Sequence, residues 1–158
     1  FDVVQPRAAG ARLHHVKCHG AFYNMAVNDE PLAEAIVRAV KDLGGGTLLY
    51  ALSGSRMMAL AEAHGVRAIA EVFADRGYED DGTLAPRGTP GAMIEEAEKS
   101  VAQALGMVED GVVLSRHGTR VAVSAGTICL HGDQPGAVVF AQALRQAFAD
   151  RGLGFAAP

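Results

Sequence analysis

Short apolar runs recur along this chain, and each one ends in a polar, charged or glycine-rich stretch. Runs of about four to eight apolar residues bounded by turn residues are typical of buried strands. The runs that we expect to form strands are 13–18, 47–52, 66–73 and 127–131. Residues 112–123 have the pattern of a β-hairpin with its turn at His117 and Gly118.

Helical periodicity fills the stretches between these strands. Asp29 is a good N-cap, and apolar residues then recur at three- and four-residue steps until Gly44. Further helices are expected between Ser55 and Gly65, over 95–109 and over 135–151. In the last of these, the spacing predicts that Val138, Val139 and Leu144 face inward.

The order of strands and helices predicts an α/β fold. Strands that are separated by helices pair in parallel through right-handed crossovers. Four such strands are too few to close an eight-stranded barrel, but they suit half to two thirds of one. We therefore predict a single α/β domain over 1–158, a partial barrel with an irregular N-terminal arm at 1–12. Its open sheet edges predict a homodimer or a complex with another chain.

The composition excludes several classes of function. The chain has 158 residues, of which 49% are hydrophobic, and a formal net charge of −4. No basic stripe stands out and Trp is absent, which argues against a nucleic-acid partner. No apolar run approaches the ~18 residues that a membrane span needs. Cys18 and Cys129 form no Cys-x-x-Cys pair, so we interpret them as reduced thiols of a cytoplasmic protein.

The first expected strand ends in groups that can do chemistry. Lys17 and His19 are two residues apart, so on a strand they point the same way. A cation beside an imidazole can bind an anion while the imidazole acts as a general base. Tyr23 and Asn24 follow directly and are candidate binding residues. The alternative is a solvated edge strand with ordinary polar residues.

The third expected strand runs into Glu71, Asp75 and Arg76. The guanidinium of an arginine is a planar fork that can bind a carboxylate or a phosphate through two hydrogen bonds. An adjacent Asp and Arg can also be no more than a surface ion pair of small energetic value. Arg87, in the glycine-rich loop 75–91, is a further candidate for anion binding or an ordinary exposed arginine.

The fourth expected strand ends in His131 and Asp133. His131 is a candidate catalytic residue, whereas Asp133 either binds substrate or caps the last helix. The carboxyl ends of parallel strands meet at one rim, where ligands bind. The side chains that we expect to meet in one cleft are Lys17, His19, Asp75, Arg76 and His131. No tight pair such as His-x-x-x-His is present, so we predict no metal site.

Several ordered motifs resemble the LamB/YcsF family. Residues 16–24, VKCHGAFYN, are similar to its V-K-P-H-G-A-L-Y-N signature, with Cys18 in place of the proline. Residues 71–87 resemble its E-x-F-A-D-R-x-Y…D-G-x-L-x-x-R stretch. Residues 91–94 and 128–133 continue the match in order. The resemblance covers nearly everything from about Leu13 to Gly152.

The resemblance implies a (β/α) barrel of the glycoside hydrolase/deacetylase type. It also implies one component of a 5-oxoprolinase that works with subunits B and C, opening 5-oxo-L-proline to L-glutamate while ATP, with Mg²⁺, is hydrolysed. No organic cofactor is expected. Candidate phosphate ligands are Lys17, Arg76 and Arg87; candidate bases are His19, Asp75 and His131.

The chain is shorter than the roughly 250 residues of a whole barrel. We therefore expect it to hold the C-terminal part of the family's barrel, without the Asp-rich first strand. Two other functions fit the residues. One is a metal-dependent, deacetylase-like hydrolase on a similar barrel, and the other is a non-catalytic remnant that binds partner subunits.

Overall fold

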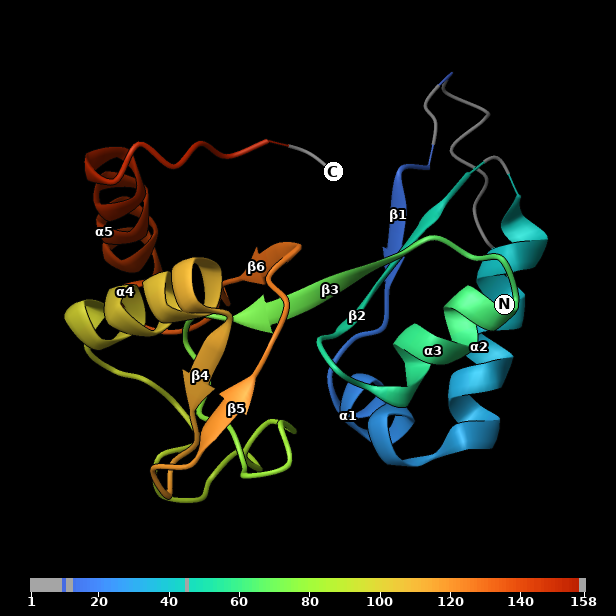
Figure 1. The fold of residues 1–158 in the computed structure, drawn as a ribbon, viewed down its shortest axis with the longest axis horizontal. Coiled ribbons are helices and arrows are strands. Elements are labelled where there is room, and N and C mark those ends of the chain that lie inside the picture. Colours follow the sequence, from blue (N-terminus) through green and yellow to red (C-terminus); the bar gives the residue numbers. More distant parts are fainter. Residues whose placement is uncertain (1–9, 11–12, 45, 157–158) are drawn as a thin grey trace.

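A four-stranded parallel sheet in the order β1-β2-β3-β6 forms the centre of the molecule (Figure 1). This computed structural model describes residues 10, 13–44 and 46–156, so most of the predicted arm at 1–12 lies outside the described residues. The strands are β1 (His15–Lys17), β2 (Leu48–Leu52), β3 (Ala68–Phe73) and β6 (Thr127–Cys129). All three pairings are parallel, which confirms the predicted α/β crossovers.

Helices and a hairpin fill the connections between these strands. The helices are α1 (Ala21–Asn28), α2 (Glu30–Leu43), α3 (Arg56–Ala63), α4 (Ala97–Leu105) and α5 (Ala137–Asp150). A π-helical turn (Gly106–Asp110) extends α4, and β4 (Val112–Leu114) pairs antiparallel with β5 (Arg120–Ala122) as predicted. Asp29 caps α2 as expected, since its Oδ1 accepts the Leu32 N–H at 3.0 Å.

The register of the sheet separates a polar face from an apolar one. Paired residues of parallel strands point to the same side, and successive residues alternate. One side carries the polar residues of the sheet together with four apolar ones: His15, Lys17, Tyr50, Glu71, Thr127 and Cys129, with Leu48, Leu52, Ile69 and Phe73. The other side carries Val16, Leu49, Ala51, Val72 and Ile128, which pack in the hydrophobic cores. Chemistry-bearing side chains therefore gather on one face.

That polar face is concave. In a flat sheet, β1 and β3 are about 9.6 Å apart and β1 and β6 about 14 Å apart. Lys17 of β1 nevertheless reaches both Glu71 of β3 and Cys129 of β6. The strands must curl toward one another, as in a section of a barrel wall, and we call this side the concave face.

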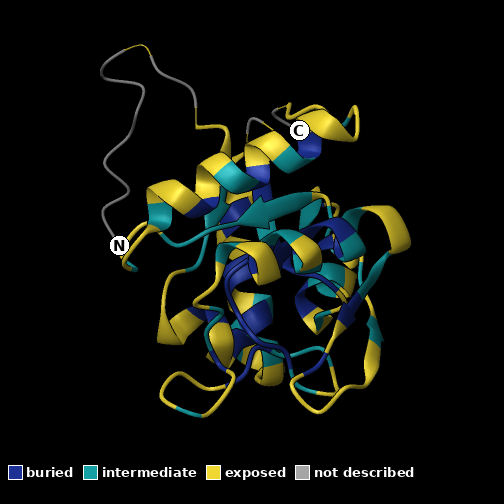
Figure 2. Ribbon diagram, turned by 90° about the vertical axis from the view of Figure 1, so that its left-hand side faces the viewer, coloured by how far each residue is buried: buried dark blue, intermediate teal, exposed yellow. Residues whose placement is uncertain are grey.

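Two hydrophobic cores pack against the sheet. The α2-side core packs α1, α2 and α3 against β2; its buried members are Ala26, Ala33, Ile36, Val37, Val40, Leu49, Ala51, Met57, Ala61 and Val66. The β3-side core surrounds β3 with residues from α4, α5 and β4. Figure 2 shows the helices buried on one side and exposed on the other.

Two features differ from the sequence prediction. The segment 21–28 forms α1, although it lacks a strong helical pattern; it buries only Tyr23 and Ala26. In α5, Val138 and Val139 are 69% and 59% exposed, so their predicted inward orientation is wrong. The buried stripe of α5 instead steps by four residues through Phe140, Leu144 and Phe148, because one face of a helix repeats at that spacing.

Within the described part of the chain, none of the helices is both long and apolar enough to span a membrane.

Candidate functional site

The centre of the candidate site is a pair formed by His131 and Asp75. The His131 Nδ1 lies 2.8 Å from Oδ2 of Asp75, and the His131 backbone N–H donates to the same oxygen at 2.8 Å. Asp75 is fully buried, while the His131 side chain is 22% exposed. Because a carboxylate only accepts, this bond places the imidazole proton on Nδ1. Nε2 is then an acceptor, which is the state that a general base needs.

Lys17 forms the second part of the site. Its Nζ donates to Oε1 of Glu71 at 2.6 Å and to Sγ of Cys129 at 3.2 Å. Burial alone lowers the pKa of Lys17, but the bond to Glu71 and the charges of Glu71 and Cys129 outweigh it, so the pKa is raised. Lys17 is therefore a protonated hydrogen-bond donor at neutral pH, suited to stabilising negative charge.

The ring of Phe73 lies between these two parts. Lys17 Nζ is 4.9 Å from the ring centroid, and the His131 ring stacks on Phe73 at a centroid distance of 5.7 Å. Phe73 is buried and presents an apolar wall next to both polar groups. An ammonium and an imidazole thus share one partly desolvated surface, where electrostatic interactions are stronger than in water.

Tyr23 of α1 is a buried neighbour of both Glu71 and Lys17, and the Lys17 Nζ lies 5.6 Å from its ring centroid. Burial and the charge of Glu71 raise the pKa of the Tyr23 hydroxyl, so it stays protonated. Within the described chain, this hydroxyl and Oε2 of Glu71 are both buried without a hydrogen bond of normal geometry. The Tyr23 hydroxyl and the Glu71 carboxylate therefore face each other in the interior of the site.

Arg76 points away from this surface and into the loop that follows β3. Its Nε donates to the Ala92 carbonyl at 3.1 Å and its NH2 group to the Ala85 carbonyl at 2.6 Å. Burial and the nearby charge of Arg87 lower the pKa of Arg76. The predicted anion-binding fork is thus occupied by backbone carbonyls, and Arg76 holds the loop together. Arg87 itself is exposed.

The packing of the same loop requires a glycine at position 77. A Cβ on Gly77 would lie 1.9 Å from the carbonyl oxygen of Gly91, so only glycine allows the two strands of the loop to approach so closely. Tyr78, fully buried, packs beneath and accepts the Phe73 N–H at 2.8 Å. The part of this loop nearest β3 is therefore packed, with Arg76, Tyr78 and Ala85 buried.

The remaining predicted residues lie at the rim. His19 is exposed just beyond β1, before Gly20 begins α1. Asn24 is exposed and donates to the Gly20 carbonyl at 3.3 Å within its own helix. Asp133 is exposed and does not cap α5, whose N-cap residue is Gly136. No contact joins these three side chains to the His131–Asp75 pair in the hydrogen bonds of the described residues.

Sequence reasoning missed two contributors. Cys129 was interpreted as a passive thiol, yet burial raises its pKa and its sulfur contacts Lys17. Phe73 looked like an ordinary strand residue. The signal that could have revealed both was strand alternation, since Glu71 and Phe73 share one face of β3, and their partners Thr127 and Cys129 share the same face of β6.

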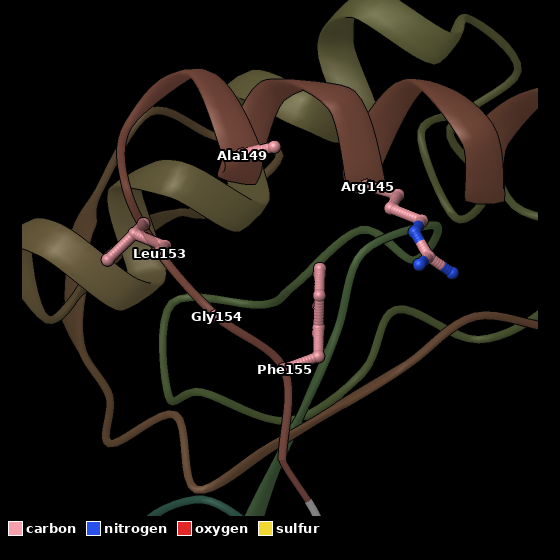
Figure 3. Close-up of a pocket in the computed structure, with 5 residues that line it drawn as sticks. All are labelled: Arg145, Ala149, Leu153, Gly154 and Phe155. Carbon is pink, nitrogen blue, oxygen red and sulfur yellow. The ribbon is translucent and has the colours of Figure 1, made fainter.

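The described residues contain no group of three or more His, Cys, Asp or Glu side chains placed to hold a metal ion. A separate hollow lies between α5 and the segment that follows it, lined by Arg145, Ala149, Leu153, Gly154 and Phe155 (Figure 3). None of its lining residues belongs to the predicted site. It therefore offers no support for the chemistry of the concave face.

The profile of the LamB/YcsF family matches residues 4–158, which is almost the whole chain. The chain belongs to the LamB/YcsF family. Among its curated relatives, the A subunit of 5-oxoprolinase from Bordetella parapertussis is 52% identical over 148 residues, covering 94% of this chain and 59% of that protein. The corresponding 5-oxoprolinase protein of Methylococcus capsulatus is 50% identical over 151 residues, covering 96% and 58%.

A solved structure supports the same assignment. The crystal structure of the lactam utilization protein from Thermus thermophilus matches with a TM-score of 0.86 and 40% identity, covering 96% of this chain and 60% of that one. The LamB/YcsF fold is therefore shared. This chain spans about three fifths of the length of the relatives it matches. The stretches of sequence that resemble the family contain Lys17, Glu71, Asp75 and His131.

Proposed function

We propose that this chain carries the acid–base site of an ATP-dependent 5-oxoprolinase that opens 5-oxo-L-proline to L-glutamate. The observation that supports it best is the His131–Asp75 pair, held at the carboxyl end of parallel strands beside a protonated Lys17. Relatives about half identical to this chain are named as the A subunit of 5-oxoprolinase. A related structure is named a lactam utilization protein.

The residues divide the chemistry between them. Nε2 of His131 accepts a proton from the attacking water and passes it to the ring nitrogen as the carbon–nitrogen bond breaks. Asp75 fixes the tautomer of His131 and stabilises the imidazolium that forms. The ammonium of Lys17 stabilises the negative charge that develops on the substrate oxygen.

ATP supplies the driving force. An unstrained five-membered lactam is a poor electrophile, and phosphorylation of its amide oxygen makes the ring carbon a better target for water. Attack by one water with cleavage of the carbon–nitrogen bond leaves an acyl phosphate, which a second water hydrolyses to glutamate and phosphate.

The three cations predicted to bind phosphate, Lys17, Arg76 and Arg87, do not converge on one site. Arg76 is occupied by the carbonyls of Ala85 and Ala92, and Lys17 is paired with Glu71. Arg87 is exposed on the loop. We therefore assign the binding of ATP and Mg²⁺ to subunits B and C, and ring opening to the concave face of this chain.

We also propose an architecture for the site. The four strands form part of a (β/α) barrel of the glycoside hydrolase/deacetylase type, with the concave face as its interior. Side chains fill the interior of such barrels, and catalytic groups lie at the carboxyl ends of the strands. Lys17, Phe73 and His131 occupy those positions.

Reconstitution tests the function. This chain is combined with purified subunits B and C of the same organism, and ATP-dependent release of glutamate from 5-oxo-L-proline is measured. We expect turnover from the assembly, none from the chain alone, and a loss of about 100-fold or more in kcat for His131→Ala. His117→Ala, on the exposed hairpin turn, is the matched control and keeps wild-type turnover. An active assembly in which His131→Ala matches wild type contradicts the proposed role.

A further inference from the structure

Gln103, which no sequence motif singled out, reaches from α4 to the end of β3. Its Nε2 donates to the carbonyl oxygen of Phe73 at 2.8 Å and to that of Arg76 at 2.9 Å. An amide nitrogen carries two hydrogens, so both bonds form at once. These two carbonyls flank Asp75 in the chain. Figure 1 shows α4 lying beside the end of β3, where this contact is made.

The segment 73–76 is fixed from its other sides as well. The Tyr78 hydroxyl accepts the Phe73 N–H at 2.8 Å, and the Ala74 N–H donates to the Cys129 carbonyl at 3.0 Å. The Asp75 carbonyl accepts the Ile94 N–H at 3.0 Å. Most of these bonds hold one backbone group each, whereas the amide of Gln103 holds two, one on each side of Asp75.

This segment carries two parts of the site. The carboxylate of Asp75 orients His131, and the ring of Phe73 lies against both His131 and Lys17. A shift of the backbone here would move both parts together. Misplacement of a catalytic group by about 1 Å can reduce the rate by about 100-fold.

We propose that Gln103 is a positioning residue that sets the His131–Asp75 pair through the backbone of 73–76. Its catalytic consequence rests on the proposed function, whereas its effect on the geometry of the pair does not. Hydrogen bonds to the carbonyls of both Phe73 and Arg76 require a side-chain amide of this length. Glutamate has the same length and methionine nearly so, but neither can donate to two carbonyls.

The tautomer of His131 gives a direct readout. In the ¹⁵N-labelled chain, the ring nitrogen shifts of His131 report whether Nδ1 or Nε2 carries the proton. We expect the Nδ1-protonated form in the wild type, and a mixture with the Nε2-protonated form in Gln103→Met and Gln103→Glu. The control is Ser100→Ala on the same helix; Ser100 is buried and its hydroxyl has no hydrogen bond among the described residues, so the wild-type tautomer is kept.

The assembled enzyme gives a second readout. We expect kcat of the Gln103 variants to fall by about 10- to 100-fold while KM changes by less than about threefold, because substrate binding groups stay in place. Folded variants that keep the wild-type tautomer overturn the positioning role, whatever their kcat. Failure of both variants to fold also overturns it, since Gln103 would then serve the fold alone.

The two proposals fail in different ways. A wild-type assembly without turnover, combined with a changed tautomer in the Gln103 variants, refutes the 5-oxoprolinase function and leaves the positioning role standing. An active wild-type assembly, combined with unchanged tautomers in the Gln103 variants, refutes the positioning role and leaves the 5-oxoprolinase function standing.

Discussion

The two cores of this molecule differ in how many polar residues are buried in and around them. Among the described residues, α2, α3 and β2, which form most of the α2-side core, contain no buried polar or charged residue. Around β3, in contrast, Glu71, Asp75, Arg76, Ser100 and Ser115 are buried together with the apolar residues of the β3-side core. Both cores pack against the same parallel sheet.

This difference suggests a division of roles, in which the α2-side core stabilises the fold and the residues around β3 carry the chemistry. A buried polar group destabilises a fold unless it is hydrogen-bonded, and a buried charge does so more strongly. Around β3 each charge has a partner: Lys17 for Oε1 of Glu71, His131 for Asp75 and loop carbonyls for Arg76. The α2-side core holds, among its described residues, no buried charge that needs a partner. Its apolar packing therefore stabilises the sheet that carries the polar groups.

The largest effect is expected for Asp75→Asn. The variant keeps the shape of the side chain, but an amide no longer enforces the Nδ1-protonated tautomer or stabilises an imidazolium. We expect kcat of the assembled enzyme to fall by about 1000-fold. Asp150→Asn, at the exposed end of α5, is the control and keeps its kcat. A loss confined to stability, with normal kcat, would show that the polar pair serves only the fold.

Leu49→Ala tests the other core. Leu49 is fully buried in the α2-side core, so its truncation removes apolar contacts and leaves a cavity. We expect the free energy of unfolding in urea to fall by about 2–5 kcal/mol, with kcat per folded molecule unchanged. Leu114→Ala, 58% exposed on β4, serves as the matched leucine control and should change stability by less than about 0.5 kcal/mol. A selective loss of kcat in Leu49→Ala would break the division between the cores.

The Lys17–Glu71 pair makes stability depend on pH. The pKa of Lys17 is raised in the folded chain above its ordinary value of 10.5, so the folded state holds this proton more tightly. The stabilisation is therefore complete below pH 10.5 and is lost as the pH rises through the folded pKa. We expect wild type to be more stable than Lys17→Met at neutral pH, and the difference to shrink above pH 10.5.

Urea unfolding of both proteins across this pH range measures the effect. Cys18, which also titrates at high pH, is present in both proteins and cancels to first order in the comparison. Cys129 contacts Lys17, so its titration is part of the measured difference. A difference that stays constant through pH 10.5 and beyond would mean that the ion pair contributes nothing to stability.

The smallest effect is expected for Val139→Lys. Val139 is 59% exposed on α5, next to the buried Phe140. The substitution should change the free energy of unfolding by less than about 0.5 kcal/mol. Phe140→Ala should lower it by about 3–5 kcal/mol. Thermal or urea unfolding of both variants checks the orientation of the helix, and a large loss in Val139→Lys would contradict it.

Much of the fold could be predicted from the sequence because local patterns carry it. The apolar runs marked the four parallel strands, and Asp29 marked the start of α2. The orientation of α5 could not be predicted in the same way. Val138 and Val139 are as apolar as residues of a core, and only the direction in which Phe140 and Leu144 pack against their neighbours excluded them.

The candidate site divides similarly. The sequence alone determined the family, the parallel α/β class and which residue types end each strand, because motifs and alternation are local properties of the chain. Tertiary structure decided which groups meet: His131 pairs with Asp75 across 56 residues, Lys17 with Glu71 across 54, and Gln103 bridges the two carbonyls beside Asp75. Tertiary structure also decided that the Arg76 side chain binds the loop carbonyls of Ala85 and Ala92. Such contacts depend on strand register and on the curl of the sheet, and these are set only when distant segments pack together.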